Sequence, residues 1–519
     1  MRKHNDLDRR DFMKMTGAAT IFLSARRWVS TAFAQGRGGV TNPDKPNIVY
    51  ILADDMGYGD LACQNPQTKI PTPNLDRLAA RGIRFTDAHS PSAVCTPTRY
   101  GILTGRYCWR SRLKRGVLSP WGRTLIEEGR LTVPTMLKTH GYHTACIGKW
   151  HLGWDWRTAD GKPVEQGSYG HGIDFSKPVA SGPTTRGFDY YFGTSVPNYP
   201  PYCFMENDRT VGIPDRPKPE SMFGHKGPMV EGWKLERILP ELARKAVAYI
   251  DNAGKGEPPT PFFLYFPLTA PHTPIEPAAR FRGKSKAGPY GDFVHQVDWT
   301  VGQIMDAVKR NGFEENTLIV FTSDNGSPAR DGLCGSTGPV GSVLKFGHDP
   351  NRPWRGRKGD AWDGGHREPF VARWPGRIAP GTISDEPICH VDLMATCAAI
   401  LGAKLPENAG EDSYNILPAL EGRKMSKPIR EAIVHHSADG LFAVRQGKWK
   451  LILGLGSGSG FSKPRRVEPK PGGPRGQLYD LHADPGESKN LWLEQQDVVE
   501  RLTALLEKYR KEGRSAPRL

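Results

Sequence analysis

The sequence Asn-Ile-Val-Tyr-Ile-Leu-Ala-Asp-Asp, residues 47–55, decides the fold class of this 519-residue chain. Its first seven residues are nearly all apolar, without the alternation typical of a half-exposed strand, so they predict a strand buried on both faces. Three further runs share this character: residues 142–148, 262–268 and 317–323. Helical patterns, several ending in glycine, lie between and after the runs: residues 73–82, 132–141, 233–252 and 290–312. Strands that alternate with helices predict an α/β fold, with a mostly parallel sheet sandwiched by helices.

The pattern changes near residue 425. Short runs at 441–445 and 448–453 predict antiparallel strands, and residues 495–511 predict a final helix. Residues 454–476 are rich in Gly, Ser, Pro and basic residues, which predicts a flexible loop between strands. We therefore expect a smaller α+β subdomain with an antiparallel sheet over residues 425–519, after a catalytic domain over residues 46–424.

The overall composition is that of a soluble globular enzyme, with 37% hydrophobic and 24% charged residues, and excludes a fibrous or wholly disordered chain. Lys and Arg number 71 against 55 for Asp and Glu, a formal net charge of +16. Such an excess is either spread over a solvated surface or directed at an acidic partner, and the composition leaves both open.

The N-terminal segment, residues 1–34, resembles a twin-arginine export signal. It has paired arginines at residues 9–10, an apolar run at 15–25 and Ala-Phe-Ala at 32–34, which fits a small-residue cleavage site. The apolar run is too short to span a bilayer, so we expect no stable membrane anchor. The leader carries seven basic and three acidic residues, so its removal would leave +12. We expect recognition by a twin-arginine translocase, a periplasmic or secreted protein, and a linker over residues 35–45.

The eight cysteines contain no Cys-x-x-Cys pair, so the sequence has no motif for a zinc or iron–sulfur cluster. A protein that folds before export does so in a reducing compartment, where structural disulfides do not form first. Each cysteine is therefore considered alone.

Polar side chains follow each of the four apolar runs: Asp54 and Asp55, Lys149 and His151, His272, then Asp324 and Asn325. Ligands of an open parallel sheet lie beyond the carboxyl ends of its strands, where these residues would meet. Carboxylate and amide oxygens without thiolates suit calcium or magnesium better than zinc. One Asp-Asp pair alone is more often a turn or helix cap, but two such pairs on one sheet edge favour a metal, because clustered carboxylates need a cation or protons to relieve their repulsion.

Cys95-Thr96-Pro97-Thr98-Arg99 stands at a predicted loop-to-helix junction, where the helix dipole favours negative charge. Position alone leaves two interpretations open, a thiolate nucleophile or a buried inert cysteine.

Cys-x-Pro-x-Arg at residues 95–99, continuing into Leu-Thr-Gly-Arg at 103–106, resembles the signature of type I sulfatases, in which the cysteine is converted to formylglycine. Further motifs of that family follow in its order: residues 54–57, 148–151, 270–272, 323–326, 357–359 with 364–369, and 477–487. Thr98 stands where many members have Ser, and Arg357 where Gly is common. The resemblance implies an alkaline-phosphatase-like fold for the region after residue 46.

The resemblance also implies the chemistry. A maturation enzyme would convert Cys95 to formylglycine, and one hydroxyl of its hydrated form, a gem-diol, would attack sulfur. One calcium ion, with magnesium less expected, would be held by five residues: Asp54, Asp55, Cys95, Asp324 and Asn325. The other roles implied are orientation of residue 95 by Arg99, bridging to sulfate by Lys149, base catalysis by His151, and protonation of the leaving oxygen by His272 with Lys358.

The expected function is hydrolysis of sulfate monoesters on a carbohydrate, with a galactose-type or N-acetylhexosamine 6-sulfate as the first guess, and no nucleic-acid partner. Two alternatives stay open: a phosphoester or phosphonate hydrolase of the same superfamily, and a non-catalytic binder of acidic glycans that keeps Cys95 as a thiol. Residues 153–192 and 196–219 predict long surface loops that shape specificity. Side chains proposed to contact sugar include Trp109, Arg110, Arg112, Lys114, Arg115, Trp154, Trp156, His171, His225, Trp354, Arg355 and His366.

Overall fold

A computed structural model describes residues 45–162, 164, 170–256, 260–334 and 338–518. The predicted leader, and the linker apart from Lys45, lie outside the described residues. Within the described part, no helix has both the length and the apolar character needed to cross a membrane. The described residues before and after residue 425 belong to one compact unit.

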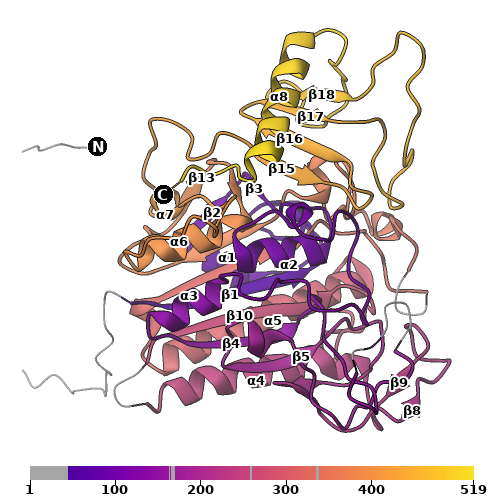
Figure 1. Cartoon of the computed structure of the whole chain (residues 1–519), viewed down its shortest axis with the longest axis vertical. Helices are drawn as coiled ribbons and strands as arrows, with labels where there is room; N and C mark the ends of the chain where they lie inside the picture. Colours follow the sequence, from indigo (N-terminus) through magenta and orange to yellow (C-terminus); the bar gives the residue numbers. More distant parts are fainter. Residues whose placement is uncertain (1–44, 163, 165–169, 257–259, 335–337, 519) are drawn as a thin grey trace, which may run out of the picture. The chain divides into compact units, whose positions relative to one another are not determined.

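The central sheet has ten strands in the order β13-β2-β12-β11-β1-β10-β4-β5-β6-β7 (Figure 1). Its five middle strands are parallel: β11 (Thr317–Ser323), β1 (Asn47–Asp54), β10 (Phe262–Pro271), β4 (His143–Lys149) and β5 (Tyr190–Thr194). The strands beside them are β2 (Ile83–Phe85), β12 (Phe370–Arg373), β13 (Thr382–Ser384), β6 (Met205–Glu206) and β7 (Arg209–Thr210). Antiparallel pairs are confined to β11–β12, β12–β2, β5–β6 and β6–β7 within this sheet. The predicted mostly parallel sheet is confirmed.

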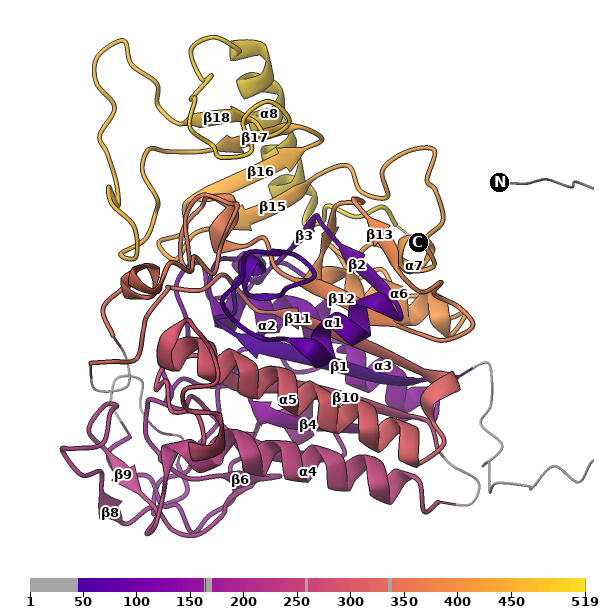
Figure 2. The same cartoon turned by 180° about the vertical axis from the view of Figure 1, so that it is seen from behind.

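Helices cover both faces of the sheet, as the apolar runs predict. In β1, Ile48 and Tyr50 pack into one core while Val49 and Ile51 pack into the other, because successive strand residues point to opposite faces. The first core includes residues of α2 (Cys95–Thr104), α3 (Val133–Thr139), α6 (Leu393–Ile400) and α7 (Leu417–Leu420). The second includes residues of α1 (Pro73–Ala80), α4 (Ile238–Ala253) and α5 (Gly288–Arg310), and Figure 2 shows α4 and α5 side by side.

Two sequence expectations need correction. The helix predicted from residue 233 begins at Ile238, because Pro240 is tolerated in the first turn of a helix but not in its interior. The predicted surface loop 153–192 is partly core, since Trp154 and Trp156 are at most 3% exposed and β5 begins inside that range. Five residues, one of them glycine, give too short a pattern to indicate β5.

The predicted antiparallel C-terminal sheet is confirmed, with its strands in chain order: β15 (Ile433–His436), β16 (Phe442–Gln446), β17 (Trp449–Ile452) and β18 (Gln477–Asp480). Helix α8 (Gln496–Glu512) packs against it through Leu502 and Leu506. The loop between β17 and β18 has neither helix nor strand; its flexibility stays a prediction. Two small sheets pair β3 (Ala88–His89) with β14 (Ile388–Cys389), and β8 (Arg216–Pro217) with β9 (Pro228–Met229).

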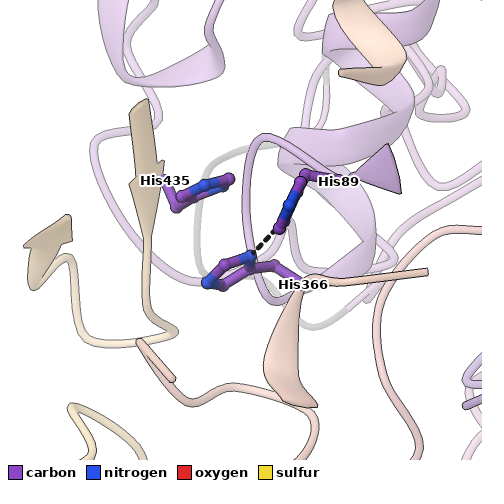
Figure 3. A group of neighbouring side chains, drawn as sticks. All are labelled: His89, His366 and His435. Atoms are coloured by element: carbon purple, nitrogen blue, oxygen red, sulfur yellow. Dashed lines mark hydrogen bonds between the residues drawn. The ribbon is translucent and has the colours of Figure 1, made fainter. Parts of the chain in front are cut away.

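Three buried histidines, His89, His366 and His435, lie where the C-terminal sheet meets the catalytic domain (Figure 3). His89 Nε2 donates to the Asp87 carboxylate (2.7 Å), and Lys450 donates to His366 Nε2 (3.2 Å). His366 Nδ1 lies 3.1 Å from His89 Nδ1, so one of these two nitrogens donates a hydrogen bond to the other. The rings of His366 and His435 are stacked, 3.8 Å apart and 15° from parallel, so their in-plane lone pairs do not converge on a metal. The cluster is a hydrogen-bonded junction.

Lys450 is a fully buried cation of this junction, paired with Asp363 (2.7 Å) and Glu487 (2.8 Å). Lys450→Ala is expected to lower the free energy of unfolding by about 3–5 kcal/mol, because it leaves the buried Glu487 without its cation and Asp363 with Arg367 alone. Denaturant unfolding measures the loss. Lys448→Ala is the control, since its half-exposed pair with Asp480 contributes at most about 1 kcal/mol. Equal losses for the two variants would contradict this account.

Candidate active site

The four predicted strand ends meet at one edge of the sheet, because β11, β1, β10 and β4 are parallel neighbours. Three short buried ion pairs form there: Asp54 with Lys149 (2.7 Å), Asp55 with Lys358 (2.6 Å) and Asp324 with Arg99 (2.7 Å). Arg99 also pairs with Asp54 at 3.4 Å. The structure thus brings together all three predicted carboxylates and three of the predicted catalytic cations. Lys358, which follows no predicted strand, arrives from the long segment between β11 and β12.

The ion pairs do not fully compensate the carboxylates. Burial alone would raise the pKa of Asp54, but Lys149 and other neighbouring charges outweigh it and hold that pKa below its usual range. Burial raises the pKa of Asp324, and the adjacent charge of Asp54 adds to the rise. This edge of the sheet therefore favours an additional cation, which would keep both groups ionised.

The donor set fits a hard divalent cation. Asn325 donates from Nδ2 to Asp55 (2.7 Å), while its Oδ1 is buried without a hydrogen-bond partner among the described residues. Ligand atoms of Asp54, Asp55 and His272 lie within 4.8 Å of one another. A buried amide oxygen left without a donor, beside clustered carboxylates, matches the oxygen ligands that calcium and magnesium prefer.

Cys95 is the first residue of α2, and its side chain faces His151. Its Sγ lies 3.2 Å from His151 Nδ1. His151 Nε2 donates to the Leu118 carbonyl (3.1 Å), so in the neutral ring Nδ1 is the unprotonated nitrogen. Burial lowers the pKa of His151, which favours that neutral ring, and burial raises the pKa of the Cys95 thiol. The unmodified cysteine is thus a poor thiolate nucleophile, next to a well-placed base.

Arg99 lies behind the carboxylates. Its Nε and Nη2 donate to Asp324, and its Nη1 donates to the Lys149 carbonyl (2.9 Å). These contacts hold two strand ends together from a fully buried position. The role of Arg99 in orienting residue 95 stays a prediction.

His272 follows β10, and one of its ring nitrogens is already engaged. Nδ1 donates to the Thr273 carbonyl (2.6 Å), which leaves Nε2 for a ligand; Nε2 lies 3.7 Å from the Asp55 carboxylate. Burial and the charge of Lys358 lower the pKa of His272 to about 4. Burial would lower the pKa of Lys358, but Asp55 raises it above its usual value.

Two of these residues adopt backbone conformations that non-glycine residues rarely take. Asp55 has φ of 69° and His151 has φ of 53°. Each stands one or two residues beyond a strand of the sheet. Left-handed backbone at such positions carries strain, which is concentrated at functional sites.

A cavity of about 670 Å³ opens over the site. Its lining includes five predicted residues: Asp55, Cys95, His151, His272 and Lys358. It also includes residues that the sequence analysis did not single out by number, among them Val117, Leu118, Ser119, Tyr199, Arg330 and Phe461. These come from loops without periodic pattern, so no sequence signal could identify them. A larger cavity, about 730 Å³, includes His143 and Phe262 at the opposite, starting ends of β4 and β10.

Some of the side chains proposed to contact sugar lie in the core or in other contacts, and one lies against the cavity wall. Trp154 and Trp156 are core residues, and His366 belongs to the histidine junction. Arg110 is held by Asp412 (2.8 Å). His225 stacks on Tyr199 of the cavity wall, with ring centroids 3.9 Å apart.

Comparison with known proteins places this site in a family. The family model described as Sulfatase matches residues 46–403. N-acetylgalactosamine-6-O-sulfatase of Bacteroides thetaiotaomicron is 34% identical over 505 residues, covering 90% of this chain and 93% of the relative. Human arylsulfatase A is 34% identical over 489 residues, covering 90% and 87%. A solved sulfatase structure from work on glycosaminoglycan metabolism by Bacteroides thetaiotaomicron superimposes with a TM-score of 0.77 at 33% identity, covering 90% of this chain and 100% of that one.

The fold agrees with these matches, since the solved sulfatase structure superimposes on 90% of a chain with a mostly parallel central sheet and a separate antiparallel sheet. The relatives match most of the chain rather than one motif. This chain therefore belongs to the type I sulfatases of the alkaline phosphatase superfamily, and it is a sulfuric ester hydrolase.

Proposed function

We propose that the chain removes sulfate from a sulfated carbohydrate, with residue 95 as formylglycine and one calcium ion at the carboxylate cluster. The observation that carries the proposal is the fixed tautomer of His151, which presents an unprotonated Nδ1 to the side chain of residue 95. The carbohydrate class is supported by relatives described as N-acetylgalactosamine 6-sulfatases.

The charge balance of the site supports an anionic substrate. Three carboxylates face three cations in the ion pairs, so the set is neutral by itself. A calcium ion, held by Asp54, Asp55, Asp324 and Asn325, would bring two positive charges. A sulfate monoester carries one negative charge and released sulfate carries two, so the loaded site would attract both.

When present, formylglycine would supply a hydroxyl nucleophile for sulfur, and calcium would polarise a sulfate oxygen. The chain's own residues manage protons and charge. His151 Nδ1 is placed to accept a proton from residue 95. His272 Nε2 and Lys358 Nζ are placed to protonate the leaving alcohol, and an anionic ester beside His272 would favour its charged ring. Lys149 and Arg99 keep the carboxylates in position.

His151→Ala is expected to lower kcat about 10²- to 10³-fold with little change in KM, because it removes a base but no group that binds sulfate through charge. Steady-state kinetics on a sulfated monosaccharide measure the loss. The control is His482→Ala, an exposed histidine of the C-terminal subdomain. Unchanged kcat in the His151 variant would remove that residue from the mechanism.

A panel of sulfated and phosphorylated mono- and oligosaccharides tests the reaction and its substrate. We expect free sulfate from a galactose-type or N-acetylhexosamine 6-sulfate, at a rate well above phosphate release from the matching phosphate ester. Faster phosphate release would favour a phosphoester or phosphonate hydrolase. Glycan binding without turnover, by a chain that keeps Cys95 as a thiol in its native host, would favour an acidic-glycan binder.

We also propose export through a twin-arginine translocase after modification by a formylglycine-generating enzyme. The support is the leader-like pattern of residues 1–34 and the Cys-x-Pro-x-Arg motif at 95–99. Cell fractionation of the native host checks the periplasmic or secreted location.

A further inference from the structure

A second cavity, about 540 Å³, adjoins the catalytic cavity, and Gly116 and Ala438 line both. We call it the arginine pocket, after the side chains that complete its lining: Arg115, Asp439, Arg465 and Arg466. Arg115 comes from the segment after α2, whereas Arg465 and Arg466 belong to the β17–β18 loop. The two cavities are therefore neighbours.

Backbone hydrogen bonds fix the arginine pocket to the catalytic loop. Gly116 N donates to the Ala438 carbonyl (2.9 Å), and Ala438 N donates to the Gly359 carbonyl (2.8 Å). Gly359 directly follows Lys358, and its own N donates to the Ala93 carbonyl (2.8 Å), two residues before Cys95. The floor of the pocket is therefore held in register with the reacting residue by the main chain.

The arginine pocket has an excess of positive charge. Asp439 accepts two hydrogen bonds of 2.6 Å from Arg465, and its carbonyl accepts one of 3.2 Å from Arg466. Three guanidinium groups thus face one carboxylate. The side chains of Arg465 and Arg466 are 59% and 60% exposed, so an incoming anion can reach them.

We propose that the arginine pocket binds a second anionic group, a sulfate ester or a carboxylate, on the sugar next to the one whose sulfate ester lies at residue 95. The proposal rests on the proposed carbohydrate sulfatase function and narrows it to polyanionic glycans. Guanidinium groups suit both anions, since their planar donors match two oxygens at once. Asp439 holds Arg465 by hydrogen bonds, and one carboxylate cannot neutralise the three arginines of the lining.

Three substrates with the same terminal 6-sulfated sugar test the proposal: one with a neutral neighbouring sugar, one with a uronic acid and one with a sulfated sugar. The variant is Arg115→Ala combined with Arg466→Ala. The control is Lys470→Ala combined with Arg475→Ala, which removes the same charge from exposed positions of the β17–β18 loop outside the pocket lining.

We expect the pocket variant to raise KM for the anionic substrates about fivefold to tenfold, because it removes two exposed ion pairs with the ligand. We expect kcat to stay unchanged. For the substrate with a neutral neighbouring sugar, KM of the variant should stay within about twofold of the wild-type value, because exposed charges act weakly at a distance. The anion with the larger rise in KM is the preferred ligand. The proposal is overturned if the control has the same effect, or if the neutral-neighbour substrate loses as much as the others.

A binding measurement separates failure of this proposal from failure of the proposed function. If the wild-type chain hydrolyses none of the three substrates, the carbohydrate sulfatase function fails. Calorimetric titration of Cys95→Ala protein with the same three oligosaccharides then tests the arginine pocket alone. Tighter binding of the anionic oligosaccharides, lost in the pocket variant and kept in the control, supports the pocket; equal binding of all three overturns it.

Discussion

Alanine at residue 95 is expected to abolish sulfate-ester turnover, with a loss of about 10⁴-fold or more in kcat/KM, because it removes the side chain that would become the nucleophile. Lys358 and His272, which line the catalytic cavity, stay in place, so the variant should still bind sulfate. Released sulfate measures turnover, and calorimetry with inorganic sulfate measures binding. Cys95 is the first residue of α2, and alanine, a strong helix former, keeps the helix.

The matched control is Cys397→Ala. Cys397 is another buried cysteine, but it belongs to α6 and contacts none of the predicted catalytic residues named above. That variant loses only core packing and is expected to keep kcat. If Cys95→Ala were as active as Cys397→Ala, residue 95 would have no part in the chemistry.

Asparagine in place of Asp54 is expected to weaken calcium binding about 100-fold and to lower turnover by a similar factor or more. The change preserves shape but removes a charge, so the buried ammonium of Lys149, 2.7 Å away, loses its counterion and repels the incoming cation. Calcium titration by calorimetry gives a reading that does not depend on activity.

Asp306→Asn provides the comparison, because Asp306 is an exposed carboxylate of α5 far along the helix from the strand ends. The Asp306→Asn variant should bind calcium with the same affinity as the wild-type protein. A calcium affinity unchanged by Asp54→Asn would mean that the strand-end carboxylates do not hold the ion.

Much of the fold and part of the site follow from local pattern. The continuous apolar run before Asp54 predicts a strand buried on both faces, and a parallel sheet then brings the residues after each strand to one edge. His272 and Asp324 were located by that argument alone. Cys95 and Lys358 follow no predicted strand, so only their motifs indicated them.

The rest depends on contacts between residues far apart in the chain. Lys450 donates a hydrogen bond to Asp363, 87 residues away, and the sequence around either residue does not predict the pair. The tautomer of His151 is set by the carbonyl of Leu118, a backbone atom that every residue possesses. The arginine pocket likewise combines Arg115 with a loop some 350 positions later. Such contacts follow from the packing of loops, which local periodicity does not encode.

The most direct test of the central claim is mass spectrometry of the tryptic peptide Phe85 to Arg99, taken from protein made in its native host or with a maturation enzyme. The account predicts formylglycine at residue 95, with an aldehyde oxygen in place of the cysteine sulfur. An unmodified Cys95 in protein from the native host would contradict it.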